Sequence, residues 1–576
     1  MKTIYFIFGF LISLIMISCN LDRIPEDTMS PETFFSSESE LELWTNYFYS
    51  QFDDAETLTG LNADDNIDNS LGDLMMGQRS PFDENGWSWS MLRSINYYLQ
   101  NSSNCDDEEV RKSYDGVAYF FRAYFYFNKV RRYGDVPWYN QVLTSADAEL
   151  LFQPRDDRAL VMDSVISDLD KAIEMLPTTK SAERVTKWTA LALKSRVALY
   201  EGTFRKYHGL SNSEKYLNHA VDASADFIQS NQYSIYNTGS EPYRFLFNDA
   251  AKSRNLTSEV ILWKVHSTAA NLMNGIQFNI ANSRQAFTRR FVNHYLMADG
   301  TRYSDQDGWE TKIFTEEVSN RDPRLAQTIL TPGYIQTGET TPTVNLMNSH
   351  TGYQPIKFVA DEAYDGANKG VINFAYFRSA EVLLNYAEAK AELGTITQND
   401  LDISINKLRT RAGMPSLSLT TANGSIDPLM VAYYPNVTTS AFTGVILEIR
   451  RERTIELAME GFRQWDLLRW KEGAAFADNF EGIYFPGIGE YDMDGDGTSD
   501  LLIYEGSAGS FEGKKMKLNA DIFLSNGTSG FVIALIEQKM DWNEGRDYLW
   551  PIPASERVLT GGKLTQNPGW SDGLSF

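Results

Sequence analysis

The pattern of apolar residues predicts a protein built mostly from helices. Apolar side chains recur at intervals of three and four residues, the period of an α-helix, in several separate segments. This pattern predicts helices over 37–52, 91–133, 155–177, 186–204, 213–230, 377–412 and 448–470. Paired helices of similar length indicate an array of helical hairpins that resembles tetratricopeptide repeats, although most consensus residues of that repeat are missing.

The segments between these helices are irregular and rich in Gly, Asn, Thr and Tyr. Short strand-like runs occur at 260–265 and 357–359, and residues 549–570 are expected to form an extended closing segment. Long loops in a compact protein usually carry function or are disordered. The predicted fold class is therefore mostly α, with a tetratricopeptide-like hairpin scaffold packed against an irregular, loop-rich lobe that has a few short strands.

The helix predicted over 448–470 carries an unusual density of charge. Its glutamates recur every four residues, at Glu448, Glu452, Glu456 and Glu460. Like charges at this spacing repel by about 0.2–0.5 kcal/mol per pair. A surface helix with mixed charges is the alternative, but the density favours an interior helix in which Glu452, Glu456 and Arg453 are buried. Their expected partners are arginines of other helices, such as Arg378, Arg409 or Arg411.

The N-terminus has the features of an export signal. A basic start is followed by an apolar run from Ile4 to Ile17 that is too short for a mature membrane span. The sequence Met16-Ile17-Ser18-Cys19 resembles a bacterial lipobox, with Met where Leu is usual. It predicts a lipoprotein signal peptide over 1–18, lipidation of Cys19 and a lipidated tether over 19–36; an ordinary signal peptide with a chance cysteine is the alternative.

Composition and charge narrow the functional classes. The 576 residues carry a formal net charge of -25, which argues against nucleic-acid binding. The aromatic content of 13% fits either a large helical core or stacking platforms for sugar rings. No HExxH motif occurs, and the 77 acidic residues make carboxylate pairs uninformative. We therefore expect no enzyme, with a glycoside hydrolase as the remote alternative.

Two irregular regions supply candidate glycan-binding residues. A loop with clustered carboxylates and amides precedes a tryptophan, and a second loop-rich region adds a cation and two more aromatic rings. Such oxygens accept hydrogen bonds from sugar hydroxyls, and an aromatic ring covers the apolar face of a sugar. The candidates are Asp64, Asp65, Asn66, Trp87, Arg290, Tyr303 and Trp309. A core or solvated role is the alternative for each of them.

An aspartate-rich loop is a candidate metal site. Oxygen ligands occur at alternate positions and Gly497 at the sixth, as in the first half of a calcium loop. Ile503 stands where a bidentate glutamate is required, so a complete EF-hand is excluded. A shorter structural calcium loop is possible, and an acidic hairpin turn is the alternative; no other cofactor is expected. The candidate ligands are Asp492, Asp494, Asp496 and Asp500.

Several short motifs, in a fixed order, together resemble one known family. They include the lipobox, Phe121-Arg122-Ala123-Tyr124, Tyr133-Gly134-Asp135-Val136-Pro137-Trp138, Arg184-Val185-Thr186-Lys187, Asn320-Arg321-Asp322-Pro323-Arg324-Leu325, Asn406-Lys407-Leu408-Arg409-Thr410-Arg411-Ala412-Gly413, the helix at 448–470 and Pro551-Ile552-Pro553. The chain resembles the SusD/RagB family of outer-membrane nutrient-binding lipoproteins of Bacteroidota. These motifs belong to the family scaffold, so none of them transfers a binding residue.

The resemblance implies a single SusD-like domain over 37–576. Its helical scaffold would occupy about 37–52, 91–230, 377–412 and 445–472, and its ligand-binding lobe about 53–90, 235–370 and 474–548. It further implies a cell-surface lipoprotein, anchored to the outer membrane by lipid alone. Such a protein would capture oligosaccharides or polysaccharides and deliver them to a SusC-like TonB-dependent transporter. Peptide capture for a peptide importer of the same kind is the alternative.

Overall fold

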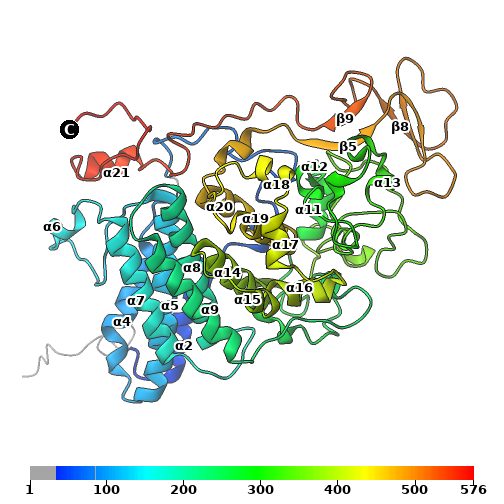
Figure 1. The fold of residues 1–576 in the computed structure, drawn as a ribbon. Helices are drawn as coiled ribbons and strands as arrows, with labels where there is room; N and C mark the ends of the chain where they lie inside the picture. The colour runs from blue at the N-terminus through cyan, green and yellow to red at the C-terminus, as the bar shows by residue number, and fades with distance from the viewer. Residues whose placement is uncertain (1–33, 85) are drawn as a thin grey trace, which may run out of the picture.

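The computed structural model describes residues 34–84 and 86–576. The predicted signal peptide over 1–18 and Cys19 lie outside the described residues. Helix accounts for 41% of the described residues and strand for 9%, so the predicted class, mostly α with few short strands, is confirmed. Figure 1 shows the long helices gathered at one side of the molecule and the irregular lobe with its strands at the other.

The long helices form an array in which neighbours along the chain pack side by side. α5 packs on α7, α7 on α8 and α8 on α9; α14 then packs on α8, α9 and α19. This succession matches the predicted hairpin scaffold. The helices of the array are α2 (Glu38–Asn46), α4 (Ser90–Asn101), α5 (Glu108–Tyr133), α7 (Arg158–Met175), α8 (Lys187–Tyr207), α9 (Ser213–Gln229), α14 (Ser379–Glu392), α19 (Thr443–Glu456) and α20 (Arg463–Arg469).

The remaining helices are short; α6 and α21 lie beside the helical array, whereas α11, α12 and α13 lie in the irregular lobe (Figure 1). The α-helical ones are α3 (Ala55–Thr59), α6 (Ala148–Leu151), α10 (Pro242–Phe245), α11 (Ile276–Asn282), α12 (Arg289–Val292), α13 (Phe314–Glu317), α15 (Gln398–Asp402), α16 (Ile405–Ala412), α17 (Leu419–Gly424), α18 (Pro428–Tyr433) and α21 (Ala554–Leu559). The 3-10 turns are η1 (Tyr47–Gln51), η2 (Ser102–Asn104), η3 (Leu256–Ser258), η4 (Tyr303–Asp305), η5 (Trp309–Thr311), η6 (Glu362–Tyr364) and η7 (Gly473–Ala477). Because α21 interrupts 549–570, the closing segment is not extended throughout.

The strands of the described chain form small, separate sheets. Three are two-stranded antiparallel ribbons: β1 (Asn66–Ile67) with β3 (Ala286–Phe287), β2 (Val260–Lys264) with β4 (Phe374–Arg378), and β5 (Glu481–Phe485) with β9 (Gly530–Ile533). The fourth sheet has three strands in the order β6 (Gly489–Tyr491), β7 (Leu501–Tyr504) and β8 (Lys514–Lys517). In it, β6 and β7 are antiparallel and β7 and β8 are parallel. Each ribbon joins segments that are far apart in sequence, so the ribbons hold the loops of the lobe in place.

The strand expected at 357–359 is a turn. Phe358 has a φ of 65°, which no strand residue adopts. The neighbouring Lys357 is fully buried, and its ammonium group contacts several acceptors at this turn. Lys357 donates to the Glu460 carboxylate at 2.7 Å, to the Ala458 carbonyl at 2.8 Å and to the Tyr243 hydroxyl at 2.9 Å.

The helix expected over 448–470 is two helices. α19 ends at Glu456 and α20 begins at Arg463, with Gly461 between them at a φ of 83°. A Cβ at Gly461 would lie 2.7 Å from the Leu58 side chain, so both the conformation and the close approach require glycine. The break turns Arg463 away from the axis of α19 and toward Asp64.

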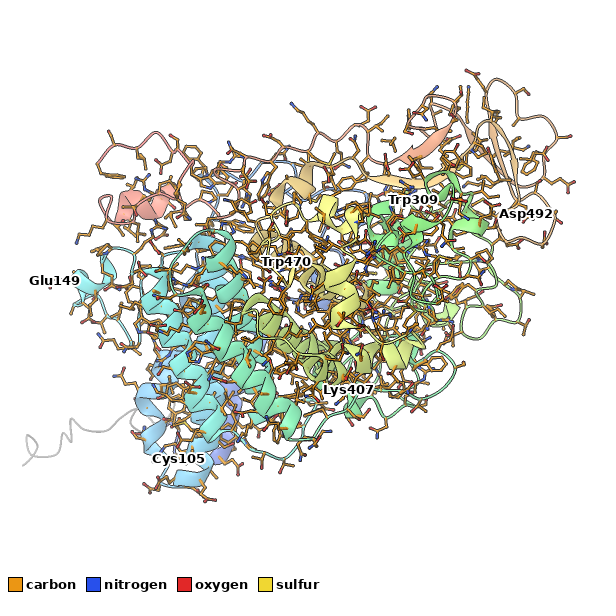
Figure 2. All side chains as sticks on the ribbon, in the orientation of Figure 1. Cys105, Glu149, Trp309, Lys407, Trp470 and Asp492 are labelled. Carbon is orange, nitrogen blue, oxygen red and sulfur yellow. The ribbon has the colours of Figure 1, made fainter. Side chains whose placement is uncertain are left out.

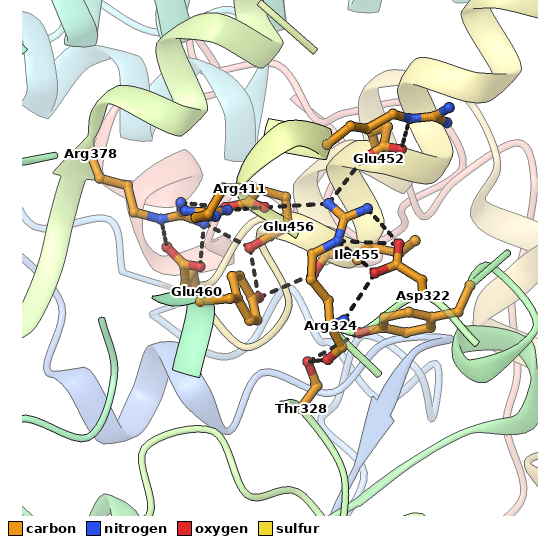
Figure 3. A network of polar contacts seen from close by, with 12 residues as sticks. Asp322, Arg324, Thr328, Arg378, Arg411, Glu452, Ile455, Glu456 and Glu460 are labelled. Atoms are coloured by element: carbon orange, nitrogen blue, oxygen red, sulfur yellow. Dashed lines mark hydrogen bonds and ion pairs between the residues drawn. The ribbon is translucent and has the colours of Figure 1, made fainter. Parts of the chain in front are cut away.

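A central ion-pair cluster joins the helical array to the irregular lobe. We define it as Glu259, Arg324, Arg378, Arg411, Glu452, Glu456 and Glu460, which are all buried. Glu456 lies at the centre: its carboxylate accepts from Arg378 at 2.7 Å and from Arg411 at 2.5 Å, and lies 3.5 Å from Arg324 (Figure 3). The predicted interior position of Glu452, Glu456 and Arg453 is confirmed.

The partners of Glu452 and Arg453 agree only in part with the prediction. Glu452 accepts from Arg409 at 2.6 Å, as expected, and also from Arg324 at 3.0 Å. Arg453 instead donates to Asp466 of α20 at 2.7 Å, because the break after α19 brings that helix back alongside it.

Candidate functional site

A cavity of about 290 Å³ opens where four segments that are distant in sequence meet. The segments are the loop at Asp64, residues 288–293 in and around α12, the end of α18 and the stretch 475–481. We call it the Tyr433 cavity, after the half-buried tyrosine that contributes its ring to the wall. Its charged and polar lining, apart from Tyr433, consists of Asp64, Thr288, Arg289, Arg290, Asn293, Asp478, Asn479 and Glu481. Of the predicted glycan-binding residues, only Asp64 and Arg290 line it.

Arg290 is held in one position by all of its neighbours. Its guanidinium lies 2.8 Å from the Asp64 carboxylate and 2.7 Å from that of Asp478. It also donates to the Tyr433 carbonyl at 2.5 Å and sits 4.5 Å from the centre of the Tyr433 ring. These contacts fix the tyrosine ring and Asp478 relative to each other, and a site with fixed groups loses little entropy on binding.

Asp64 is a structural anchor beneath the cavity. It is 2% exposed, and both of its oxygens accept from Arg463 at 2.6 Å. Burial alone would raise the pKa of Asp64, but the guanidiniums of Arg463 and Arg290 outweigh burial and lower it. The carboxylate is therefore ionised and engaged with protein groups, so it positions Arg290 rather than meeting a ligand.

Asp65 and Asn66 lie behind the cavity and are almost fully buried. Burial, and secondarily the charge of Asp64, raises the pKa of Asp65 to about 7. Asn66 belongs to β1 and donates to the Thr59 carbonyl at 3.4 Å. Neither side chain lines the Tyr433 cavity, so the structure gives both a supporting position in the β1–β3 ribbon.

An aromatic group lies next to the cavity and is joined to it by Arg289. The guanidinium of Arg289 sits 3.9 Å from the ring centre of Phe531 and 5.2 Å from that of Trp309. Trp309 is half-buried and packs edge-on against Tyr303, which is 3% exposed and donates to the Trp309 carbonyl at 3.0 Å. Trp309 thus offers part of its ring to the surface, whereas Tyr303 supports it from behind.

Trp87 lies apart from the other candidates, in the helical half of the molecule. It is 7% exposed, and its ring packs edge-on against Tyr133 of α5 and against Trp89. The structure thus gives Trp87 a core position, the alternative considered for it, away from Asp64 and Arg290. The Trp87 ring is buried in the aromatic core of the helical array, because burying a large aromatic side chain is strongly favourable.

Sequence reasoning missed the residues that shape the cavity most. Tyr433, Asp478, Asn479 and Glu481 come from segments that show no common motif, and they meet only through the fold. Arg463 was recognised as part of a charged helix, but its partner Asp64 lies 399 residues away. The one available signal was the Tyr433-Tyr434 pair within a loop between predicted helices.

The aspartate-rich loop is folded between β6 and β7, at the end of the irregular lobe where Figure 2 labels Asp492. Within the described chain, Asp492, Asp494 and Asp500 bring ligand oxygens to within 4.8 Å of one another, whereas Asp496 is exposed and stands outside this group. Partial burial and the neighbouring carboxylates raise the pKa of Asp494. Calcium binding by this loop stays a prediction.

Calcium at about 10 mM should stabilise the protein if the loop binds it with millimolar or sub-millimolar affinity. The expected gain in the free energy of unfolding is about 1–3 kcal/mol, because only the folded loop assembles the ligands. Thermal unfolding with calcium, with magnesium and in the Asp494→Asn variant measures this. An equal gain in wild type and Asp494→Asn would contradict a calcium site at this loop.

The fold is that of a helical-hairpin scaffold that presents a polar cavity in an irregular lobe. In the part of the chain that the structure describes, no helix is both long and apolar enough to cross a membrane. A model of the SusD family matches residues 258–570, more than half of the chain, and a model described as "Starch-binding associating with outer membrane" matches 79–199. The chain belongs to the SusD family.

Relatives and solved structures agree with this assignment. "SusD-like protein P2" of Formosa agariphila is 24% identical, over 97% of this chain and 98% of the relative. A SusD-like protein of Bacteroides fragilis has a similar fold, with a TM-score of 0.68 and 23% identity over 96% of this chain and all of that one. A SusD-like carbohydrate binding protein of the same species also has a similar fold. Its TM-score is 0.67 and its sequence identity is 21%, over 92% of this chain and 99% of that one.

Proposed function

We propose that this protein is a cell-surface glycan-binding lipoprotein that captures oligosaccharides or polysaccharides and passes them to a SusC-like TonB-dependent transporter of the outer membrane. Membership of the SusD family, a family model described as starch-binding and associated with the outer membrane, and a neighbouring structure described as carbohydrate binding support it. The lipid anchor would be Cys19. The protein would bind its ligand without changing it.

The observation that carries the proposal is the arrangement of the Tyr433 cavity. A half-buried tyrosine ring stands beside two exposed polar side chains, Asp478 and Asn479, and Arg290 fixes their relative positions. A sugar unit has an apolar face for the ring and hydroxyl groups for a carboxylate and an amide. Trp309 and Phe531 extend this surface beyond the cavity.

The size of the cavity indicates how a polymer would be held. Pockets that enclose a small ligand usually measure about 300–1,000 Å³, and this one lies at the lower limit. One or two sugar units would enter it, and the rest of the chain would lie across the surface. The ligand would therefore be selected by local contacts with a few units rather than by its length.

Binding to a panel of glycans tests the proposal. Affinity gels with immobilised polysaccharides, followed by isothermal titration with the matching oligosaccharides, should identify at least one glycan with a micromolar to millimolar dissociation constant. The same panel should include mixed-sequence peptides, since peptide capture is the alternative within the family. Binding of peptides without any glycan, or release of shortened oligosaccharides during long incubation, would overturn the proposed function.

A further inference from the structure

A second, larger cavity lies beside β8, which Figure 1 places at the outer end of the irregular lobe. We call it the Lys514 cavity. Its volume is about 680 Å³, within the range of about 300–1,000 Å³ that is typical of ligand pockets. Its walls come from the end of α11 and the residues after it (280–284), from residues 347–354, and from β8 and the turn that follows it (514–521). It shares no lining residue with the Tyr433 cavity.

The Lys514 cavity has the opposite charge to the chain as a whole. The sequence carries a formal net charge of -25. The charged residues that line the cavity are three cations, Arg284, Lys514 and Lys515, and one carboxylate, Asp521. The lining of the Tyr433 cavity has instead three carboxylates and two arginines. A local excess of positive charge on an acidic protein attracts negatively charged ligands.

The protein does not neutralise the cations of this cavity. All three are exposed, and within residues 34–84 and 86–576 no carboxylate oxygen lies within 4.0 Å of their side-chain nitrogens. Lys515 donates only to the Gly509 carbonyl, at 3.3 Å. Asp521 is occupied, since its carboxylate accepts a backbone N–H of its own turn at 2.8 Å. The positive charge is therefore available to a ligand.

Arg284 is held in position at the wall of the cavity. Its backbone has a φ of 50°, a left-handed conformation that is uncommon for residues other than glycine. Its carbonyl accepts the backbone N–H of His350 at 3.1 Å, and its Nε donates to the Asn348 carbonyl at 3.4 Å. Met347, in the same wall, also has a positive φ, of 56°. Such conformations persist where the surrounding structure fixes them, and they cluster at ligand sites.

The strand β8 sets Lys514 beside an apolar floor. It runs parallel to β7 in a fixed register. Because side chains two positions apart leave the same face of a strand, Lys514 and Met516 share one face. Met516, Met347 and Ile280 are buried and line the cavity. A cation at the rim above an apolar floor fits a ligand that has both an acidic group and an apolar face.

The amide groups of the wall add hydrogen-bonding capacity. The side chains of Asn348 and Gln354 line the cavity, and neither makes a hydrogen bond to another described residue. An amide offers both donors and an acceptor to hydroxyl groups. A guanidinium or an ammonium group binds a carboxylate or a sulfate through charge-assisted hydrogen bonds. A sugar unit with an acidic substituent combines all of these features.

The aspartate-rich loop lies next to β8 but leaves the cations unpaired. The backbone N–H of Lys514 donates to the Asp500 carbonyl at 2.8 Å, so the two segments are adjacent. The Asp492 carboxylate accepts two backbone N–H groups of its own loop, at 2.6 and 2.8 Å, and the Asp500 carboxylate accepts that of Met493 at 2.8 Å. None of the aspartates of this loop lines the Lys514 cavity.

We propose that the Lys514 cavity binds an acidic sugar unit, whose carboxylate or sulfate group contacts Arg284 and Lys514 while its hydroxyl groups contact Asn348 and Gln354. The inference rests on the proposed function, because it names a class of glycan for the same protein. A glycan that mixes acidic and uncharged units would contact this cavity and the Tyr433 cavity together. It would bind more tightly than a short oligosaccharide that reaches only one of them, since the second contact becomes intramolecular.

Isothermal titration tests this with short galacturonate, alginate and sulfated chondroitin oligosaccharides, and with malto-oligosaccharides as uncharged references. Wild type should bind at least one acidic oligosaccharide, and the affinity should fall about fivefold or more between about 50 and 300 mM salt, because salt screens exposed charges. Arg284→Gln and Lys514→Gln should each weaken this binding about tenfold. The matched control is Lys407→Gln, which removes the same charge from an exposed position on α16 (Figure 2) and should bind as wild type does.

A second measurement separates a shaped site from general attraction between charges. Polyglutamate of similar charge should bind at least about tenfold more weakly than the best acidic oligosaccharide, because it has no hydroxyl groups for the two amides. Equal binding of polyglutamate, or unchanged affinity in both Arg284→Gln and Lys514→Gln, would overturn the acidic-sugar site. Binding of uncharged glycans alone would also overturn it and leave the proposed function intact. No binding of any glycan by wild type would overturn both.

Discussion

Glu456→Gln should lower the free energy of unfolding by about 3–5 kcal/mol, the cost of removing one partner from a fully buried ion pair. Glu456 is 0% exposed, and Arg378 and Arg411 are buried as completely around it. Glutamine has nearly the same shape, so the change removes charge without opening a cavity. The two guanidiniums would then share Glu259 and Glu460 as their remaining carboxylates.

The matched control lies on the same helix. Glu448 occupies α19 two turns earlier, but its side chain is 13% exposed, and its contacts to Arg409 and Arg451 are 3.4 and 3.2 Å long. Glu448→Gln should cost about 1 kcal/mol or less, the value of a partly solvated pair. Chemical denaturation of both variants measures the difference. Equal stability of Glu456→Gln and wild type would show that the ion-pair cluster contributes nothing net.

The cost of Glu456→Gln should also depend on pH in a defined direction. Burial alone would raise the pKa of Glu456, but Arg411, Arg378 and Arg324 outweigh it and lower the pKa to about 2. The folded-state pKa is thus below the unfolded value of about 4.5. Stability from Glu456 is therefore present above pH 4.5 and is lost as the pH falls toward 2. The gap between wild type and Glu456→Gln should narrow over this interval.

The fold could be predicted from the sequence wherever a local pattern decides the structure. The start of α8 follows from its helical period and from the capping residue Thr186, and the start of α9 at Ser213 follows from its helical period. The buried position of Glu456 could be predicted too, because four glutamates at intervals of four residues require counter-charges. The break at Gly461 was missed, since a single glycine inside a helical pattern does not by itself stop a helix.

For the candidate site, the sequence allowed a prediction of some of its residues but not of how they are arranged. Asp64 and Arg290 carry the right chemistry and do meet, yet their distance depends on Arg463 and on the β1–β3 ribbon, which no local pattern encodes. Trp87 shows the opposite case: it follows the same loop in sequence, but the core of α5 buries it. Loops are placed by long-range contacts, so a binding surface built from loops appears only with the fold.

Tyr433→Ala should weaken glycan binding by about ten- to thirty-fold, which corresponds to about 1.4–2 kcal/mol for the loss of one anchoring aromatic ring. Removal of the ring takes away the apolar wall of the cavity and also one of the contacts that hold Arg290. Isothermal titration with the best oligosaccharide of the panel measures the change, and circular dichroism confirms that the variant is folded.

Two further variants separate the ring from its surroundings. Tyr433→Phe keeps the ring and loses only the hydroxyl, which accepts from Asn293 at 3.0 Å, so its affinity should stay within about threefold of wild type. Asn479→Ala changes an exposed side chain that the core does not need, and it should weaken binding by about three- to tenfold if the amide meets a sugar hydroxyl. If Tyr433→Ala and Asn479→Ala both bind the glycan as wild type does, the role assigned to the Tyr433 cavity is disproved.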